Sequence, residues 1–172
     1  MENLLKSQKS LMISSLSKNS NPEVSYAPFI MKNNKLYIYI SKAANHYFNL
    51  LENNKCSVMI IEDENESKSI FARQRVSFSC EAEIKSDDSN CILDEFEKIH
   101  GSQIMMVLKS LDFDIFEINI KNGRLVKGFG QAFDIEIIGE EFVLNQVNGG
   151  DINKNKALHY VQCLILLKYS SF

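Results

Sequence analysis

The stretch Cys56–Ile84, CSVMIIEDENESKSIFARQRVSFSCEAEI, constrains the fold of this chain most strongly. Its first part, Ser57–Ile61, is apolar at both odd and even positions after the serine, which predicts a strand buried on both faces. An acidic break follows. From Ala72 to Cys80 apolar and polar residues alternate, broken only at Gln74, which predicts a strand with one face in the core. The chain therefore contains neighbouring strands around a shared core.

Two arginines, Arg73 and Arg75, fall on the polar side of the second strand together with Ser77 and Ser79. Adjacent guanidinium groups repel each other unless an anion lies between them, and their donors suit phosphate or carboxylate oxygens. A plain alternative is a solvated strand edge, where the arginines pair with the acidic run Glu62, Asp63, Glu64 and Glu66. Both interpretations stay open at this level.

The first half of the chain predicts three short strands and a helix. Strands are expected over residues 11–16, 24–31 and 36–40, and Asn33-Asn34 predicts the hairpin between the last two. A helix is expected from the N-cap Ser41 through residue 54. Its buried face would hold Ala44, Tyr47, Phe48 and Leu51.

The second half predicts two helices and more strands. Helices are expected over Asp87–His100, ended by Gly101, and over Ser102–Leu111. A strand over Phe113–Ile120 would turn at Asn122-Gly123 into a last strand that contains Gly128 and Gly130. Glycines inside a strand indicate a bulge or a close approach by another group.

Composition indicates one ordinary globular domain and limits the classes of ligand. The 172 residues are 45% hydrophobic and 24% charged, with a formal net charge of −3. Without a basic run, general nucleic-acid binding is not expected. The scattered cysteines predict buried thiols rather than a zinc site or disulfides: Cys56, Cys80, Cys91 and Cys163.

The amino-terminal residues lack the long apolar core of a secretory signal. The most apolar segment, Val161–Leu167, is far shorter than the ~20 residues that span a bilayer. We therefore expect a cytoplasmic protein that does not cross a membrane.

Four segments in this order resemble the HugZ/HutZ family of haem-utilisation proteins: SYAPFI, LYIYISKAANHYFNLLENNKCSVMIIEDE, SKSIFARQRVSFSCEA and VKGFGQAFDI. The resemblance covers Leu11–Ile137. This family belongs to the pyridoxamine-phosphate-oxidase-like, FMN-binding split-barrel superfamily. The resemblance implies a mainly β fold, a six-stranded antiparallel split barrel with flanking helices. It also implies a homodimer with ligand sites at the subunit interface. The barrel domain would span residues 1–138, and residues 139–172 would form a tail that packs on the barrel or the partner subunit.

The resemblance also implies that the ligand is haem, which is cleaved oxidatively to release iron. Arg73, Arg75 or Lys127 would then hold the propionates, and Arg73 or Arg75 could donate to iron-bound oxygen. The segment Gly128-Phe129-Gly130 would allow a flat approach to the haem face. In this family the iron ligand is a histidine in the carboxyl-terminal loop. At that place, directly after Gly149-Gly150, this chain has Asp151. The nearest histidine in its tail is His159.

Two other functions remain open. The same cations could hold the phosphate of FMN in an oxidoreductase of the pyridoxamine 5'-phosphate oxidase type. Alternatively, the protein could store or carry haem without cleaving it, which the absence of a histidine directly after Gly149-Gly150 would favour.

Overall fold

The computed structural model describes residues 1–86, 89–139 and 141–147. In chain order the elements are α1 Glu2–Ser7, β1 Ser10–Leu16, β2 Pro22–Lys32, β3 Lys35–Ser41, α2 Asn45–Glu52, β4 Lys55–Ile61, η1 Glu64–Glu66, η2 Ile70–Ala72, β5 Arg75–Ile84, α3 Ser89–His100, α4 Ser102–Leu108, β6 Phe113–Gly128, β7 Gln131–Ile138 and β8 Glu141–Gln146. The two η elements are single turns of 3-10 helix. In these residues no helix is long and apolar enough to cross a membrane.

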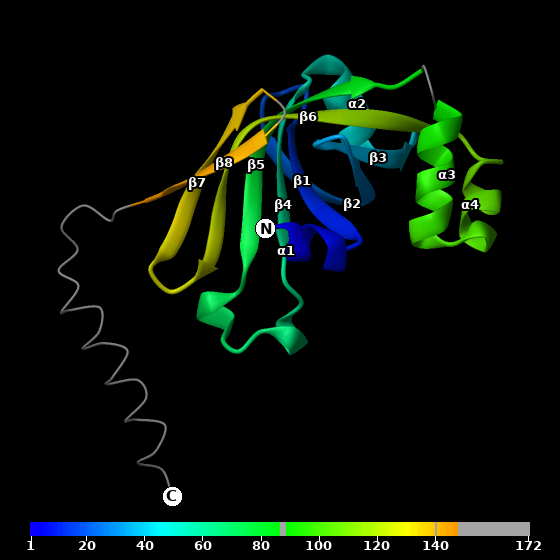
Figure 1. Ribbon diagram of the computed structural model, residues 1–172. Coiled ribbons are helices and arrows are strands. Elements are labelled where there is room, and N and C mark those ends of the chain that lie inside the picture. The colour runs from blue at the N-terminus through cyan, green and yellow to red at the C-terminus, as the bar shows by residue number, and fades with distance from the viewer. Residues whose placement is uncertain (87–88, 140, 148–172) are drawn as a thin grey trace, which may run out of the picture.

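Six strands close into an antiparallel barrel, which confirms the expected fold. The strand order is β3-β2-β1-β4-β5-β6, and β3 also pairs with β6, so the ring has no open edge. Strands β7 and β8 continue the sheet outward from β6 (Figure 1). The expected boundary after residue 138 falls at the turn between β7 and β8, and residues 148–172 of the expected tail lie outside the described residues.

The barrel interior is filled by every second residue of its strands, such as Ile13, Val58, Val76 and Phe78. Helix α1 adds Leu4 and Leu5 to this core, and α2 adds Tyr47 and Leu50. A second cluster joins α3 and α4 to the outside of β2, β3 and β6 through Ile92, Phe96, Met105, Ile30, Tyr37, Tyr39 and Ile115. The helices therefore cover different parts of one barrel.

The predicted hairpin at Asn122-Gly123 is wrong, because β6 runs unbroken through it. A Cβ atom on Gly123 would lie 2.5 Å from the Phe78 ring and 2.5 Å from the Ser77 carbonyl oxygen. The pairing of β5 with β6 shifts beside this position, between Ser79 and Cys80. Glycine is needed here for the close approach of a buried ring, not for a turn.

The predicted last strand is divided by a turn. Strand β6 ends at Gly128, and Phe129 and Gly130 connect it to β7. Gly128 has φ +155° and Gly130 has φ +67°, values that residues with a Cβ atom rarely adopt. The hairpin at Asn33-Asn34 is confirmed, with φ of 52° and 58°.

Helix α2 is shorter and rotated relative to the prediction. It begins after Ala44 rather than Ser41. Phe48 and Leu51 are 58% and 52% exposed. Asn49 faces the barrel instead, where its amide nitrogen donates to Ser15 Oγ at 3.1 Å and to Glu23 Oε2 at 2.9 Å. The buried face of the helix therefore consists of Tyr47, Asn49 and Leu50.

Helix α4 ends at Leu108, three residues before the predicted end. Met105 is its buried residue, whereas Ile104, Met106 and Val107 are 48%, 70% and 52% exposed. The predicted apolar face of α4 is thus mostly outside the core. In helix α3, Ile92 and Phe96 are buried as expected, whereas Ile99, which the same spacing predicts to face inward, is 39% exposed.

Candidate functional site

The outward-facing residues of four neighbouring strands form a continuous surface, which we call the outer strip. Strand register places Tyr26 opposite Met12, Met12 opposite Met59, and Met59 opposite Ser77. A second row runs beside the first. The strip consists of Tyr26, Met12, Met59 and Ser77 in one row and Val24, Ser14, Ser57 and Ser79 in the other.

None of these eight side chains is charged, and all are partly or fully exposed. Val24 is 73% exposed and Tyr26 is 64% exposed. The prediction that β4 is buried on both faces is therefore wrong for this chain, since Val58 and Ile60 are buried but Met59 and Ile61 are only half-buried. An uncharged, partly apolar barrel face indicates a surface that contacts something other than water.

Two arginines lie at the end of the strip. Arg124 is opposite Ser77, and Arg75 is two residues before Ser77 on β5. The Arg124 guanidinium contacts Asp134 Oδ1 from Nε at 2.9 Å and from Nη2 at 2.8 Å. Arg75 Nη1 donates to the Arg73 carbonyl oxygen at 3.2 Å. Sequence reasoning missed Arg124 because it was assigned to a hairpin, although its alternation with buried Leu125 indicates a strand.

Arg73 does not share this face, because β5 begins only at Arg75. Arg73 follows η2, and its Nη1 contacts Glu64 Oε1 at 2.7 Å. Its Nε and Nη2 donate to the Glu62 carbonyl oxygen, the former at 3.0 Å. Of the two interpretations of Arg73, the structure therefore supports pairing with the acidic run. The physical cause is that the strands stop pairing at Ile61 and Arg75, so the chain beyond forms a loop.

Lys127 and the glycine turn lie at the same end of the barrel as Arg75, since Arg75 pairs with the nearby Val126. Lys127 is exposed and lies where the pairing of β6 with β7 is irregular, between Val126 and Gly128. Its Nζ is 5.1 Å from the centre of the Phe133 ring. Phe129, in the turn, is 61% exposed. The predicted residues come together at one end but on different faces.

Two histidines have contacts within the fold. His46 Nδ1 is 2.9 Å from Ser25 Oγ, and burial lowers the pKa of its imidazole. His46 is half-buried. His100 Nε2 lies 3.1 Å from the Phe29 carbonyl oxygen, and its ring stacks on Phe96. The predicted iron ligand, His159, lies outside the described residues.

The cysteine prediction is confirmed for two residues. Cys56 and Cys80 are buried and lie opposite each other on β4 and β5. Their mutual hydrogen bond and burial raise the pKa of the Cys80 thiol. Cys91 is exposed, contrary to the prediction, and receives a hydrogen bond from Lys32 Nζ at 2.8 Å. Cys163 lies outside the described residues.

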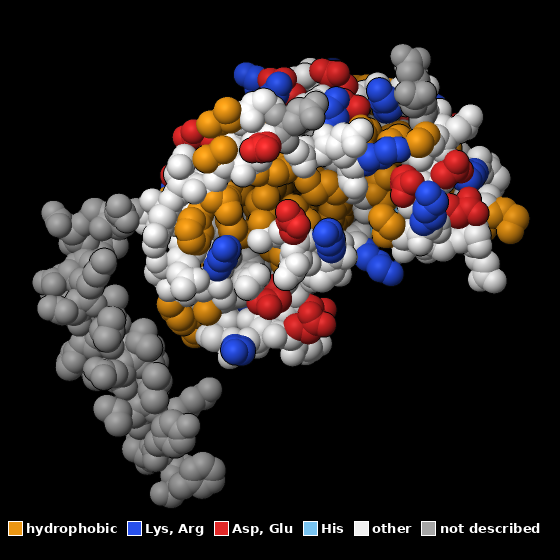
Figure 2. All heavy atoms as spheres, in the orientation of Figure 1, with side chains coloured by type: hydrophobic (Ala, Val, Ile, Leu, Met, Phe, Trp, Pro, Cys, Tyr) orange, Lys and Arg blue, Asp and Glu red, His pale blue; other side chains and the backbone are white. Residues whose placement is uncertain are grey.

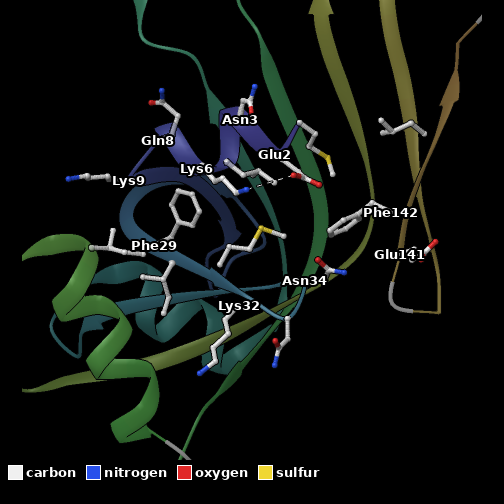
Figure 3. Close-up of a pocket in the computed structure, with 17 residues that line it drawn as sticks. Glu2, Asn3, Lys6, Gln8, Lys9, Phe29, Lys32, Asn34, Glu141 and Phe142 are labelled. Carbon is white, nitrogen blue, oxygen red and sulfur yellow. Dashed lines mark ion pairs between the residues drawn. The ribbon is translucent and has the colours of Figure 1, made fainter.

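A separate hollow of about 1090 Å³ lies between α1, the β2–β3 hairpin and β8 (Figure 3). Its lining includes the apolar residues Leu5, Phe29, Met31, Phe142 and Leu144. Figure 2 shows hydrophobic side chains gathered in the middle of this face, with acidic and basic side chains around them. Charges of both signs, such as Lys6 and Glu2 in an ion pair at 3.8 Å, line the hollow. The lining of the hollow therefore does not favour a ligand of one charge sign.

Comparison with known proteins gives a consistent family assignment. Residues 1–127 match the family model described as pyridoxamine 5'-phosphate oxidase. The chain is 34% identical over 139 residues to the haem oxygenase HutZ of Vibrio cholerae, covering 79% of this chain and 78% of HutZ.

Solved structures agree with this assignment. Campylobacter jejuni ChuZ superposes with a TM-score of 0.77 and 33% identity, over 88% of this chain and 63% of ChuZ. The chain thus spans less than two thirds of the ChuZ chain. The crystal structure of Vibrio cholerae HutZ, described there as a haem storage protein, gives a TM-score of 0.68 and 34% identity, over 75% of this chain and 93% of HutZ. The chain therefore belongs to the pyridoxamine 5'-phosphate oxidase family, within its HugZ/HutZ group of haem-utilisation proteins.

Proposed function

We propose that this protein binds haem against the outer strip, as a homodimer, and cleaves it oxidatively so that iron is released for use. The observation that carries the proposal is the uncharged strip that ends at Arg75 and Arg124. The haem named in the descriptions of HutZ supports the choice of ligand.

The residues present fit the chemistry of haem. Its macrocycle is flat and apolar, which suits a surface of methionine, tyrosine, valine and serine side chains. Its two propionates are anionic, and guanidinium donors suit carboxylate oxygens. Arg75 supplies such donors beside the strip, and Arg124 would offer those that its contact with Asp134 leaves open. Lys127 with the turn Gly128-Phe129-Gly130 would line the same end of the barrel.

A homodimer would bury the strip. The apolar pattern of β4 predicts burial on both faces, and this chain alone buries only one of them. A two-fold interface places the same patch of each subunit against the other. The second subunit would also exclude water from Arg75 and Arg124, which strengthens their contacts with an anion.

In the proposed reaction haem would supply the redox chemistry with dioxygen, and an external reductant would supply the electrons. Arg75 would position the propionates and could donate to a polar group above the haem face. Arg73 would act on the site through the loop that it holds, because its donors are engaged by Glu62 and Glu64. His159 would ligate the iron, and the strip would keep water away.

A visible absorption titration of the purified protein with hemin, and in parallel with FMN, tests the proposal. We expect a saturable Soret band near one haem per subunit, which decays when a reductant is added in air. A stable band under the same conditions would favour a storage or carrier role, the description given to the HutZ crystal structure. Failure to bind hemin would overturn the proposal.

FMN is the second candidate ligand, because the matching family model is that of pyridoxamine 5'-phosphate oxidase. Arg75 and Arg124 would then hold the flavin phosphate. Binding of FMN without binding of hemin would assign the protein to the flavin branch of its family.

His159 is tested by substitution. We expect His159→Ala to shift or remove the Soret band, whereas His100→Ala, which changes a histidine bonded to Phe29, should leave the band in place. An unchanged spectrum for His159→Ala would remove this residue from the site.

A further inference from the structure

Three of the most exposed apolar side chains lie at the barrel end that holds Arg75. Ile70 and Phe71, in η2, are 59% and 79% exposed, and Phe129, in the β6–β7 turn, is 61% exposed. Exposing two phenylalanines and an isoleucine to water is unfavourable by about 25 cal/mol per Å² of apolar surface. Such a group indicates a contact surface.

The three residues come from two segments that the fold brings together. Element η2 packs against β6. Arg75, three residues after η2, pairs with Val126, three residues before Phe129. Figure 1 shows the loop between β4 and β5 and the turn between β6 and β7 at the same lower end of the barrel.

The loop that carries Ile70 and Phe71 is held by specific hydrogen bonds. Arg73 ties its end to Glu62 and Glu64. Ser67 Oγ donates to the Ser69 carbonyl oxygen at 2.9 Å, and the Ala72 amide donates to the same oxygen at 2.9 Å. The exposed side chains are therefore presented by a bonded turn.

This end also continues the outer strip. Half-buried Ile61 lies opposite Arg75, which in turn lies opposite half-buried Val126. Apolar surface thus surrounds the arginine on both neighbouring strands. A flat, apolar molecule with carboxylates at its edge matches an arrangement of this kind better than a fully polar anion does.

We propose that Ile70, Phe71 and Phe129 form an apolar rim that contacts the macrocycle of the tetrapyrrole held at the outer strip. This inference rests on the proposed function and adds the residues that would select a large aromatic ring. Because the rim touches the ring and not the iron, it should affect metal-free protoporphyrin IX as much as hemin.

The experiment compares Phe71→Ala and Phe129→Ala with the control Phe48→Ala in the full chain. Phe48 is 58% exposed on α2, which lies at the upper end of the barrel in Figure 1, away from the β4–β5 loop. Affinity for hemin is measured by absorption, and affinity for protoporphyrin IX by fluorescence quenching. We expect each rim variant to weaken both ligands about ten-fold, because the alanine covers less of the apolar macrocycle, and Phe48→Ala to change neither.

A further variant separates binding from folding. Phe71→Leu keeps an apolar side chain and should retain most of the affinity that Phe71→Ala removes, with unchanged thermal unfolding for both. If hemin and protoporphyrin IX bind the rim variants as tightly as the wild type, the proposed contact between rim and macrocycle is wrong. The proposal that the protein binds haem is then unaffected. A rim variant that becomes monomeric with unaltered affinity would assign these residues to the subunit interface, which also overturns the inference. Wild-type protein that binds neither ligand would refute the proposed function itself.

Discussion

The two faces of β4 carry the same kind of side chain in opposite surroundings. Val58 and Ile60 point into the barrel and are 1% and 0% exposed, whereas Met59 and Ile61 point outward and are half-buried. The inward pair is buried by this chain alone. The outward pair is as apolar as the inward pair, but this chain does not fully bury it. Hydrophobicity in a sequence therefore does not reveal whether the same chain or another molecule covers a side chain.

The largest expected effect lies inside the barrel. Phe78 is 1% exposed and its ring stacks on Phe142 of β8 at 6.1 Å between centroids. We expect Phe78→Ala to lower the free energy of unfolding by about 3–5 kcal/mol, since it leaves a cavity in the core. Denaturant unfolding followed by circular dichroism measures it. A loss below about 1 kcal/mol would mean that the interior collapses easily around this site.

The next effect concerns the close approach at Gly123. We expect Gly123→Ala to cost about 1–3 kcal/mol, because its Cβ atom would meet both a ring and a carbonyl oxygen. Asn122→Ala, one residue away on the exposed side of β6, is the matched control and should change stability by less than about 0.5 kcal/mol. Equal losses of stability for the two variants would contradict the assignment of Gly123 to the side that contacts Phe78 and of Asn122 to the exposed side.

A buried carboxylate gives a smaller, pH-dependent effect. Burial tends to raise the pKa of Glu117, but hydrogen bonds from Lys35 and Tyr37 and the charge of Lys85 lower it below its ordinary value of 4.5. A lowered pKa stabilises the folded state above that ordinary value, and the contribution is lost as the pH falls through the folded pKa. Burial and the same carboxylate raise the pKa of Tyr37 to about 12.

We expect Glu117→Gln to lower the free energy of unfolding by about 1–2 kcal/mol at pH 7, discounted because Lys35 is partly exposed. Unfolding measured from pH 7 down to pH 3 should show the difference between wild type and variant shrinking. A difference that grows on acidification would have the wrong sign for a carboxylate with a lowered pKa.

The smallest effect on folding is expected on the outward face. Met59→Glu should change the stability of a single chain by less than about 0.5 kcal/mol, yet it places a charge in the outer strip. We expect it to give monomers in sedimentation experiments and to weaken hemin binding. Val107→Glu, which charges an exposed apolar site on α4, is the control. A dimer that survives Met59→Glu would place the interface elsewhere.

Much of the fold follows from the sequence, because strand alternation and turn residues are local signals. The strands around Leu11, Leu36 and Val76 and the hairpin at Asn33-Asn34 are predicted correctly. Family resemblance adds the closure of the barrel, which no local pattern contains, since β3 and β6 are far apart in the chain.

The errors arise where a distant contact overrides a local signal. Asn122-Gly123 predicts a turn, but Phe78 on the neighbouring strand needs the space of Gly123. The apolar stripe of α2 predicts burial of Phe48, but the helix buries Leu50 and the hydrogen-bonded Asn49 instead. Arg73 and Arg75 share a parity, but the loop before β5 separates them. Arg124 is recognisable as a site residue only once β6 is known to be continuous.

The length of β6 has a consequence for how the protein is made. This strand pairs with β3, β5 and β7, and its pairing with β3 joins Tyr37 to Glu117, 80 positions apart. Contacts that close such a long loop form slowly. A chain still being synthesised, with residues up to 112 available, would have two unpaired strand edges, at β3 and at β5. Because unpaired edges join other chains, a truncation before Phe113 is expected to aggregate rather than fold into a smaller barrel.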